Sequence, residues 1–223
     1  EDAPHLYKES PLGWIPKDWE VCRVANLIVG IDAGKSPNCQ DVPACGDQWG
    51  VLKVGAVHPD GLKLHENKVI EEEIFKKSNY LVRNGDLLFS RANTLDLVGF
   101  VCHVINSPKF LMLSDKTLRL TVKPSHMITR FLFWHFQHPE VRAQIEIGAT
   151  GTSGSMKNIS QSSIENILVC RPQINEQEKI TQRLDNAVNN HKAEIENLLK
   201  MQSLKTALMD DLLTGRIRVT SLL

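Results

Sequence analysis

Residues suited to base recognition stand close together near the middle of the chain. The stretch SRANT places Arg91, Asn93 and Thr94 directly after an apolar run that predicts a strand. A guanidinium can form a bidentate hydrogen-bonded pair with guanine, and an asparagine amide can form one with adenine. This stretch therefore favours contact with DNA bases. The alternative is that Arg91 pairs with Asp86 or Asp96 inside the protein.

A second polar loop, GATGTSGSMKN at 148–158, combines small hydroxyl residues with a lysine. Hydroxyl groups and backbone amides bind phosphate, while lysine and asparagine side chains also reach base edges. The DNA-contact candidates in this loop are Thr152, Ser153 and Lys157. The loop lacks GxGxxG order, so a dinucleotide site is weakly supported. A plain flexible connector is the alternative interpretation.

A third polar loop, within residues 30–50, contains the sequence GKS. The spacing between Gly30 and Gly34 is one residue short of the phosphate-binding P-loop pattern, and Pro37 stands where a helix should begin. We therefore interpret it as an exposed loop, because loops this long in compact domains are often functional. Lys35, Ser36 and the following Lys53 join the DNA-contact candidates.

Other reactive residues do not form a catalytic or metal-binding pattern. His135 and His138 have HxxH spacing but no third ligand nearby, which favours core packing or helix capping. The run Glu71–Glu73 is interpreted as a solvated first helical turn. Five cysteines without a CxxC pair fit reduced thiols in the cytoplasm. We expect no catalytic residue, no metal and no cofactor.

Composition limits the class of protein without identifying it. The chain has 26 Lys and Arg against 26 Asp and Glu, so bulk charge gives no indication of nucleic-acid binding. DNA binding must then depend on a local patch. No apolar run approaches the ~20 residues of a membrane span, and the first residues lack the apolar core of a secretory signal. We expect a soluble, cytoplasmic protein without a membrane partner.

The elements that position these loops are short strands mixed with helices. Strands are predicted at 51–57, 62–64, 87–91, 98–104, 116–124 and 168–172, with turns at 58–61 and 84–86. In 116–124, Leu118, Leu120 and Val122 alternate onto one face. Helices are predicted at 71–81, 128–137, 139–147 and 160–167. Residues 21–29 fit either a strand or a short helix, and residues 1–20 fit an extended segment that docks Trp14 and Trp19 on the domain.

The longest predicted element is a helix over 175–214. Asn175 is a good N-cap with Glu178 three residues later, and Gly215 supplies a helix stop. Such a helix needs a partner, because lone helices of this length are rare. A heptad arrangement predicts a coiled-coil seam, although a solvated helix packed on its own domain remains the alternative. The apolar seam residues, which we expect to contact a partner helix, are Leu184, Val188, Ile195, Leu198, Met209 and Leu212.

A second apolar stripe begins after Leu198, with Met201, Leu204 and Leu208. The buried face therefore rotates or serves two neighbours. Taken together, the sequence predicts an α+β protein. A mixed α/β domain with a twisted sheet spans 1–173, and the long C-terminal coiled-coil helix lies within 174–223.

Four stretches together resemble the specificity subunits of Type I restriction-modification enzymes. They are LGWIPKDWEV, NGDLLFSRAN, TGTSGSMKNISQSSIENILVCRPQINEQEKI and LMDDLLTGRI. The resemblance extends over nearly the whole chain, and the order and spacing of the stretches make it specific. The chain also lacks the NPPF/NPPY-type motif, which agrees with a non-catalytic role.

The resemblance implies a DNA target recognition domain followed by a spacer helix. In that family a full-length subunit has two such domains, and separate subunits methylate adenine and cleave DNA. The implied partners are double-stranded DNA, a methyltransferase subunit and a restriction subunit. This chain holds one domain and one helix, as a half-length subunit or an excised half would. A natural half should form a homodimer through the helix and recognise a symmetric split site.

Two hypotheses from other classes remain open. A nucleotide-dependent enzyme would use the GKS loop and would bind nucleotide in calorimetry. A coiled-coil adaptor without a DNA role would give no sequence-selective protection of DNA.

Overall fold

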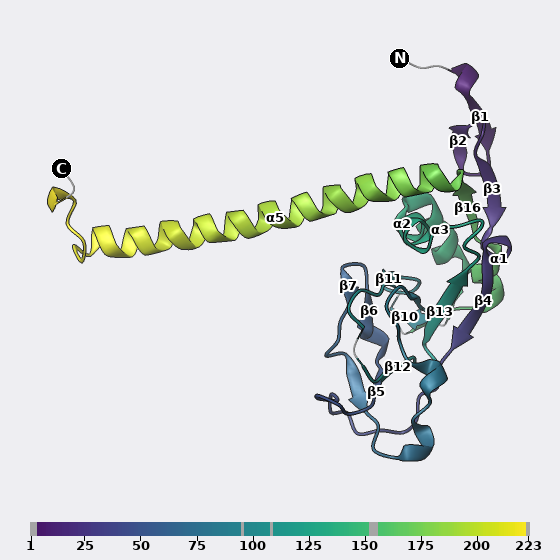
Figure 1. Ribbon diagram of the computed structural model, residues 1–223, viewed down its shortest axis with the longest axis horizontal. Helices are drawn as coiled ribbons and strands as arrows, with labels where there is room; N and C mark the ends of the chain where they lie inside the picture. The colour runs from purple at the N-terminus through teal and green to yellow at the C-terminus, as the bar shows by residue number, and fades with distance from the viewer. Residues whose placement is uncertain (1–3, 95, 108, 152–155, 222–223) are drawn as a thin grey trace. The chain divides into compact units, whose positions relative to one another are not determined.

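The computed structural model describes residues 4–94, 96–107, 109–151 and 156–221. The chain divides into two compact units, Glu1–Glu178 and Lys179–Leu223. The first unit holds the strands and the short helices, and the second holds most of the long helix α5, Ile174–Leu213 (Figure 1). The predicted α+β class with a long C-terminal helix is confirmed.

A four-stranded antiparallel sheet forms the centre of the first unit. Its strands follow the order β11–β9–β13–β4, with bounds Val101–His103, Leu87–Ser90, Thr117–Val122 and Ile28–Ala33. Every residue of β9 is buried, which means that both faces of this strand are covered. Helix α2, Thr129–Gln137, contacts β9 and β11, and the rings of Phe89 and Phe136 meet edge-on at 5.6 Å.

A smaller three-stranded sheet, β12–β5–β8, lies beside a second set of buried residues. Its strands are Leu111–Met112, Gly50–Leu52 and Asn67–Val69, with β5 parallel to β12 and antiparallel to β8. The hairpin of β6, Val57–His58, and β7, Gly61–Leu62, confirms the predicted turn. The predicted returning strand 62–64 is present only at Leu62, and the predicted strand 51–57 is interrupted by a 3₁₀ turn at Val54–Ala56. The core here includes Leu52, Val57, Val82, Leu88, Val104 and Leu113.

The remaining strands form smaller sheets, some of local pairs and some of pairs distant in sequence. Strand β3, Glu20–Arg23, pairs with β16, Leu168–Arg171, and β1, Tyr7–Ser10, pairs with β2, Gly13–Pro16. Strand β15, Lys157–Ile159, lies between β10, Ala92–Asn93, and β14, Ala149–Thr150. The short helices are α1 at Val24–Leu27, α3 at Pro139–Gly148 and α4 at Gln161–Asn166.

Several local predictions are confirmed by these bounds. The helices predicted at 128–137 and 139–147 are α2 and α3, and Pro139 begins α3. Ser160 caps α4 by accepting from the amide of Ser163 at 3.0 Å. Residues 21–29, which fit either a strand or a short helix in the sequence, contain most of β3, all of α1 and the start of β4. Gly85 has a φ of 85° in the predicted 84–86 turn.

The helix predicted at 71–81 is wrong. The segment forms only two 3₁₀ turns, Glu73–Phe75 and Ser78–Tyr80. The backbone of Tyr80 and Val82 is instead engaged by β12 and its continuation: Val82 donates to Leu111 at 2.8 Å, and Leu113 donates to Tyr80 at 2.9 Å. Tertiary pairing therefore overrides the local helix pattern.

Other predictions need correction in detail. Trp14 is 68% exposed, so it does not dock on the domain, whereas Trp19 is half-buried and donates from Nε1 to Glu176 at 3.1 Å. The predicted loop at 148–158 contains β14 and β15, and strand structure continues through Ala33 into the predicted loop 30–50. In strand β13 the predicted face of Leu118, Leu120 and Val122 is buried, but Thr117 and Arg119 on the other face are buried as well, and only Thr121 is exposed.

Helix α5 begins one residue earlier than predicted, and Asn175 is not its N-cap. The amides of Glu176 and Gln177 donate to the carbonyl of Gln173 at 2.9 and 3.0 Å, which places Asn175 inside the first turn. The side chain that holds this turn is Gln177, which is fully buried. Its amide nitrogen donates to His126 and Pro172, and its oxygen accepts from Ile128 at 2.9 Å.

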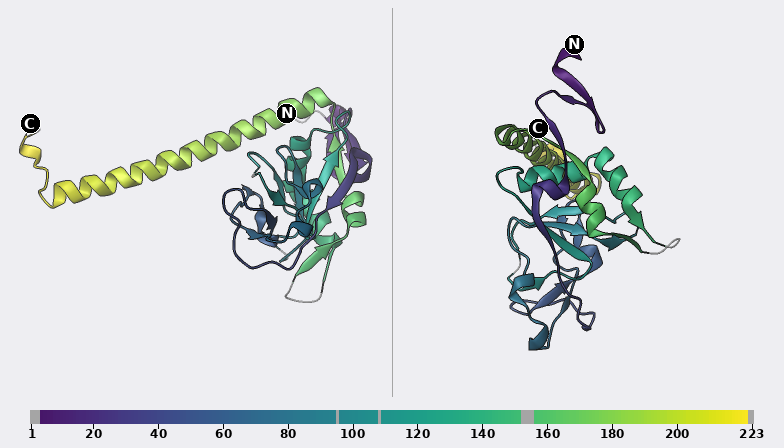
Figure 2. Two further views of the ribbon diagram at one scale, coloured as in Figure 1. Left: turned by 60° about the horizontal axis from the view of Figure 1, so that its bottom comes forward. Right: turned by 90° about the vertical axis from the view of Figure 1, so that its right-hand side faces the viewer.

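The second unit is a continuous helix that ends at the predicted stop (Figure 2). Gly215 has a φ of 71° and donates to Leu212, and Ile217 donates to Asp211. No helix in the described ranges is long and apolar enough to cross a membrane. The apolar seam residues predicted on α5 are all exposed or half-exposed, with Leu198 57% and Leu212 40% exposed.

Candidate nucleic-acid interface

Three loops meet at one end of the central sheet. Strands β4 and β9 both run antiparallel to β13, with Ala33 opposite Leu118 and Ser90 opposite Thr117. The carboxyl ends of β4 and β9 therefore lie beside the amino end of β13. This register brings together the loop after β4, the loop after β9 and the segment 114–116. These segments contain most of the predicted DNA-contact residues.

Close backbone contact joins the loop after β4 to the segment before β13. The amide of Gly34 donates to the carbonyl of Ser114 at 3.1 Å, and a Cβ at Gly34 would lie 1.8 Å from a carbonyl oxygen. Glycine is required by this approach, because any side chain would clash with backbone. The hydroxyl of Ser36 donates to the carboxylate of Asp115. Lys35 and Ser36 are both exposed beside this contact.

The backbone of Arg91, in the loop after β9, bonds both to segment 114–116 and to strand β15. Its amide donates to the carbonyl of Lys116 at 2.9 Å, and its carbonyl accepts from Ile159 at 3.0 Å. Its guanidinium forms no hydrogen bond or ion pair with any residue that the structure describes. The alternative in which Arg91 pairs with Asp86 is wrong, since Asp86 accepts from Nε of Arg119 at 2.9 Å. The half-buried Arg91 side chain thus keeps its donors available.

Strand pairing brings Lys157 to Asn93, but the two side chains differ in accessibility. Lys157 lies opposite Asn93 in the β10–β15 pair, and its ammonium donates to the carbonyl of Gly151 at 2.9 Å. Asn93 is 7% exposed. Its side-chain nitrogen donates to the carbonyl of Val54, and its side-chain oxygen accepts from the backbone amide of Thr94. This burial favours a structural role for Asn93. The exposed Thr94 follows it directly.

Two predicted contacts cannot be placed. Thr152 and Ser153 lie outside the described residues, between β14 and β15. Of the described strands on either side of these positions, β15 pairs with both β14 and β10.

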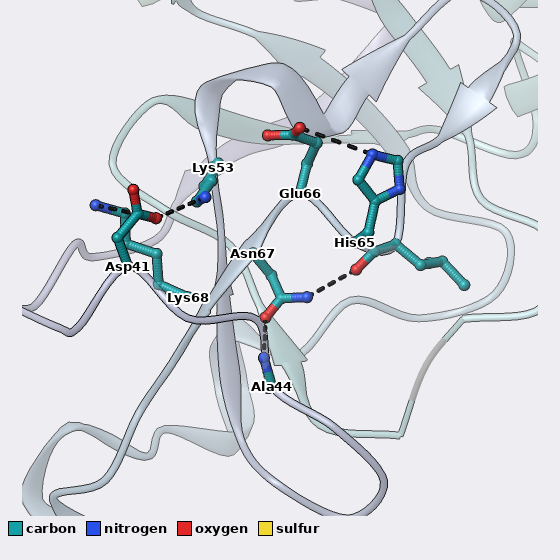
Figure 3. Close-up of polar contacts among 8 residues, drawn as sticks. Asp41, Ala44, Lys53, His65, Glu66, Asn67 and Lys68 are labelled. Carbon is teal, nitrogen blue, oxygen red and sulfur yellow. Dashed lines mark hydrogen bonds and ion pairs between the residues drawn. The ribbon is translucent and has the colours of Figure 1, made fainter.

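Lys53 lines a hollow of about 620 Å³ at this end of the domain. Its ammonium lies 2.6 Å from the carboxylate of Asp41, and that of Lys68 lies 3.9 Å from the same carboxylate (Figure 3). The hydrogen bond between Lys53 and Asp41 lowers the pKa of Asp41 and raises the pKa of Lys53. Both groups are therefore charged near neutral pH.

A second ion pair lines the same hollow. Lys116 donates to Asp115 at 2.8 Å. Partial burial raises the pKa of Asp115, but hydrogen bonds from Lys116 and Ser36 outweigh it and leave the pKa below its ordinary value. Glu66 also lines the hollow. Three lysines of this surface, Lys53, Lys68 and Lys116, are consequently matched by carboxylates.

Four residues of this surface were missed in the sequence: Asp41, Lys68, Asp115 and Lys116. Lys116 begins the alternating stretch KTLRLTV, and only the register between β9 and β13 places it next to Arg91. Asp41 and Lys68 are far apart in sequence and come together through β5 and β8. Sequence spacing alone carries no indication of either contact.

The histidine pair fits packing better than ligation. The His135 ring meets Phe131 edge-on at 4.9 Å, and desolvation lowers the pKa of His135 to about 4, so the ring is neutral near pH 7. His138 separates α2 from α3 and accepts from the amide of Arg142. Within the described ranges, no group of three or more His, Cys, Asp or Glu side chains is arranged to hold a metal ion.

Comparison with known proteins identifies the family. The family model for the Type I restriction modification DNA specificity domain matches residues 16–201. The chain belongs to this specificity-domain family. The matched region includes all the loops at the end of the central sheet and more than half of α5.

Relatives of this specificity-domain chain agree with the assignment. The EcoEI specificity subunit of Escherichia coli is 31% identical over 159 residues, covering 71% of this chain and 27% of that protein. The putative MjaX specificity subunit of Methanocaldococcus jannaschii is 25% identical over 205 residues, covering 87% and 46%. The chain thus spans less than half of the length of these two relatives.

A solved structure shares the fold. The crystal structure of the Type I restriction-modification S subunit from M. genitalium superposes with a TM-score of 0.54 at 14% identity. The match covers 86% of this chain and 44% of that one. At this identity the likeness concerns the fold alone.

Proposed function

We propose that this chain is a DNA-specificity module that recognises one part of a split target and directs a methyltransferase to it. Its role is non-catalytic, and it acts on DNA in the cytoplasm. The observation that carries the proposal is the convergence of the loops after β4 and β9 with segment 114–116 at one end of the sheet. Family membership supplies the class of ligand.

The convergent loops suit the two kinds of DNA contact differently. Arg91 keeps its guanidinium donors available, which suits a bidentate contact with a guanine edge in the major groove. The remaining candidates are proposed for backbone contacts that set position. They are Lys35, Ser36, Lys53, Thr94 and Lys157. Arg91 is therefore the proposed specificity residue. Thr152 and Ser153 remain proposed contacts on sequence grounds.

Helix α5 is proposed as the assembly element of the module. The part of α5 in the second unit of the chain exposes a shallow apolar hollow of about 390 Å³. The hollow is lined by Met201, Leu204, Lys205, Leu208, Met209, Leu212 and Leu213. Exposed apolar surface of this kind favours association. A second copy of the helix is the proposed partner, giving a homodimer that presents two identical readers. Methyltransferase and restriction subunits are the further proposed partners, and residues 1–173 are the proposed recognition domain.

Replacing Arg91 with alanine tests the recognition surface. We expect specific binding by the complex with its methyltransferase subunit to weaken by about 1 to 3 kcal/mol, because one bidentate base contact is lost. Discrimination should fall at one base position, whereas loss of a phosphate contact would weaken all sequences alike. The measurement is the affinity for the methylated target against versions substituted at single positions.

Arg83→Ala is the matched control for this experiment. Arg83 is an exposed arginine that precedes β9, so it lies at the opposite end of the sheet from the half-buried Arg91. The Arg83→Ala variant should leave the discrimination between target and substituted DNA unchanged. Unchanged discrimination in Arg91→Ala would remove Arg91 from the proposed site. Equal binding of all sequences by the unaltered complex would favour an adaptor without DNA recognition.

A further inference from the structure

One carboxylate lies between two lysines from different parts of the smaller sheet. Asp41 comes from the loop after β4, Lys53 follows β5, and Lys68 is in β8, where it lies opposite Val51. Figure 3 shows the Asp41 carboxylate directed at the Lys53 ammonium, with Lys68 beside them. The side chain of Asp41 remains 67% exposed, and those of Lys53 and Lys68 are 27% and 38% exposed. The pair is thus open to solvent and to a ligand.

The loop that carries Asp41 is attached to the sheet by hydrogen bonds. Asn67, which is only 2% exposed, accepts from the amide of Ala44 at 2.8 Å and donates to the carbonyl of Leu64 at 2.7 Å (Figure 3). The amide of Val69 donates to the carbonyl of Val42 at 2.8 Å. Bonds at 42 and 44 therefore hold the chain beside Asp41 in place. The carboxylate reaches the lysines from an anchored segment.

The chemistry of this cluster suits a phosphodiester. Two ammonium groups that converge on one oxyanion present the donors that a DNA phosphate needs. DNA affinity that is independent of sequence arises when cations replace the counterions of phosphates. A lysine that is already paired with a carboxylate contributes less to DNA affinity, because its ion pair within the protein must separate before the lysine can bind a phosphate. Asp41 occupies the position that suits the phosphate.

We propose that Lys53 and Lys68 form a binding site for a DNA backbone phosphate, and that Asp41 fills this site as an internal counterion in the free domain. This inference rests on the proposed DNA-binding function and adds a specificity device to it. Arbitrary DNA gains little from the two lysines because it must displace Asp41. Target DNA offsets that displacement through its base contacts. Asp41 thereby widens the difference between target and non-target affinity.

Asp41→Asn tests the inference because it removes the charge and keeps the shape of an exposed side chain. We expect the Asp41→Asn variant of the 223-residue chain to bind random-sequence duplex DNA about tenfold more tightly than the unaltered chain near 0.1 M salt. The slope of log affinity against log salt should be steeper by about 0.9 to 1.8. Fluorescence anisotropy of a labelled duplex across a salt series measures both quantities. Adding Lys53→Ala and Lys68→Ala to Asp41→Asn should abolish the gain.

Asp47→Asn is the matched control, since it removes one negative charge from the same loop. Asp47 faces Lys109 at 3.7 Å, and both side chains are largely exposed. Equal affinities and slopes for Asp41→Asn and Asp47→Asn would overturn this inference alone, provided that the unaltered chain binds DNA. A gain that survives removal of both lysines would also overturn it. Absence of DNA binding by every variant at low salt would overturn the proposed function together with it.

Discussion

Leu198→Asp combined with Leu212→Asp should convert the chain from a dimer to a monomer. Burying a leucine side chain is worth about 1.5 to 3 kcal/mol, and two-fold symmetry removes each contact twice. The substitutions also place carboxylates in an apolar seam, where unpaired charges are strongly disfavoured. Sedimentation equilibrium should give twice 25.1 kDa for the unaltered chain and 25.1 kDa for the double variant.

A matched pair of substitutions separates seam position from added charge. Asn189→Asp and Ser203→Asp introduce the same two charges at exposed positions outside the heptad seam. They should leave the mass at that of the dimer. An unchanged mass in the Leu198 and Leu212 variant would contradict the coiled coil. A monomeric mass for the unaltered chain would show that α5 requires a partner other than its own copy.

Asp86→Ala is expected to destabilise the first unit, Glu1–Glu178, strongly. Asp86 and Arg119 form an ion pair in which the side chains are only 13% and 10% exposed. The same carboxylate accepts from the amide of Arg83 at 2.8 Å. The free energy of unfolding should fall by about 3 kcal/mol, because removing one partner leaves a largely buried charge without its counterion. Urea unfolding followed by tryptophan fluorescence gives this quantity.

An exposed pair provides the comparison for Asp86→Ala. Asp47→Ala breaks the Asp47–Lys109 contact, where the side chains are 84% and 76% exposed, and should change stability by less than about 0.5 kcal/mol. Arg119 retains its hydrogen bonds to the carbonyls of Asn79 and Leu81 in both the Asp86→Ala and the Asp47→Ala variants. Equal stabilities of the two variants would mean that the Asp86–Arg119 pair contributes no more than a surface contact.

The sequence was most informative where structure depends on local pattern. Helix α5 follows from an uninterrupted stretch between Pro172 and Gly215, and the 84–86 turn and helices α2 and α3 follow from glycine and proline positions. Helix α5 starts one residue earlier than predicted, because the amides of Glu176 and Gln177 bond to the carbonyl of Gln173. The side chain of Gln177 bonds to backbone that is distant in sequence, at His126 and Ile128. A glutamine inside a polar helical turn gives no indication that it is buried.

The candidate surface depended on pairing that the sequence does not reveal. Arg91 and Lys157 are predicted from their own loops, but only the fold shows that the two segments pair, with Asn93 opposite Lys157 and the amide of Ile159 bonded to the carbonyl of Arg91. Asn93 had a residue type suited to adenine, but its burial could be known only from the fold. Asp41 was overlooked because its significance comes from Lys53 and Lys68. Residue type therefore predicted candidates, and strand register determined which of them share a surface.

Mapping the adenines methylated by the complex tests the central claim most directly. The chain would be co-expressed with a methyltransferase subunit, the complex purified, and modified positions in a DNA library located by sequencing. The account predicts methylation within one split target whose two halves are inverted copies, together with relaxed recognition at one position of each half in Arg91→Ala. Methylation without sequence preference, or a complex that forms and selects no target, would contradict it.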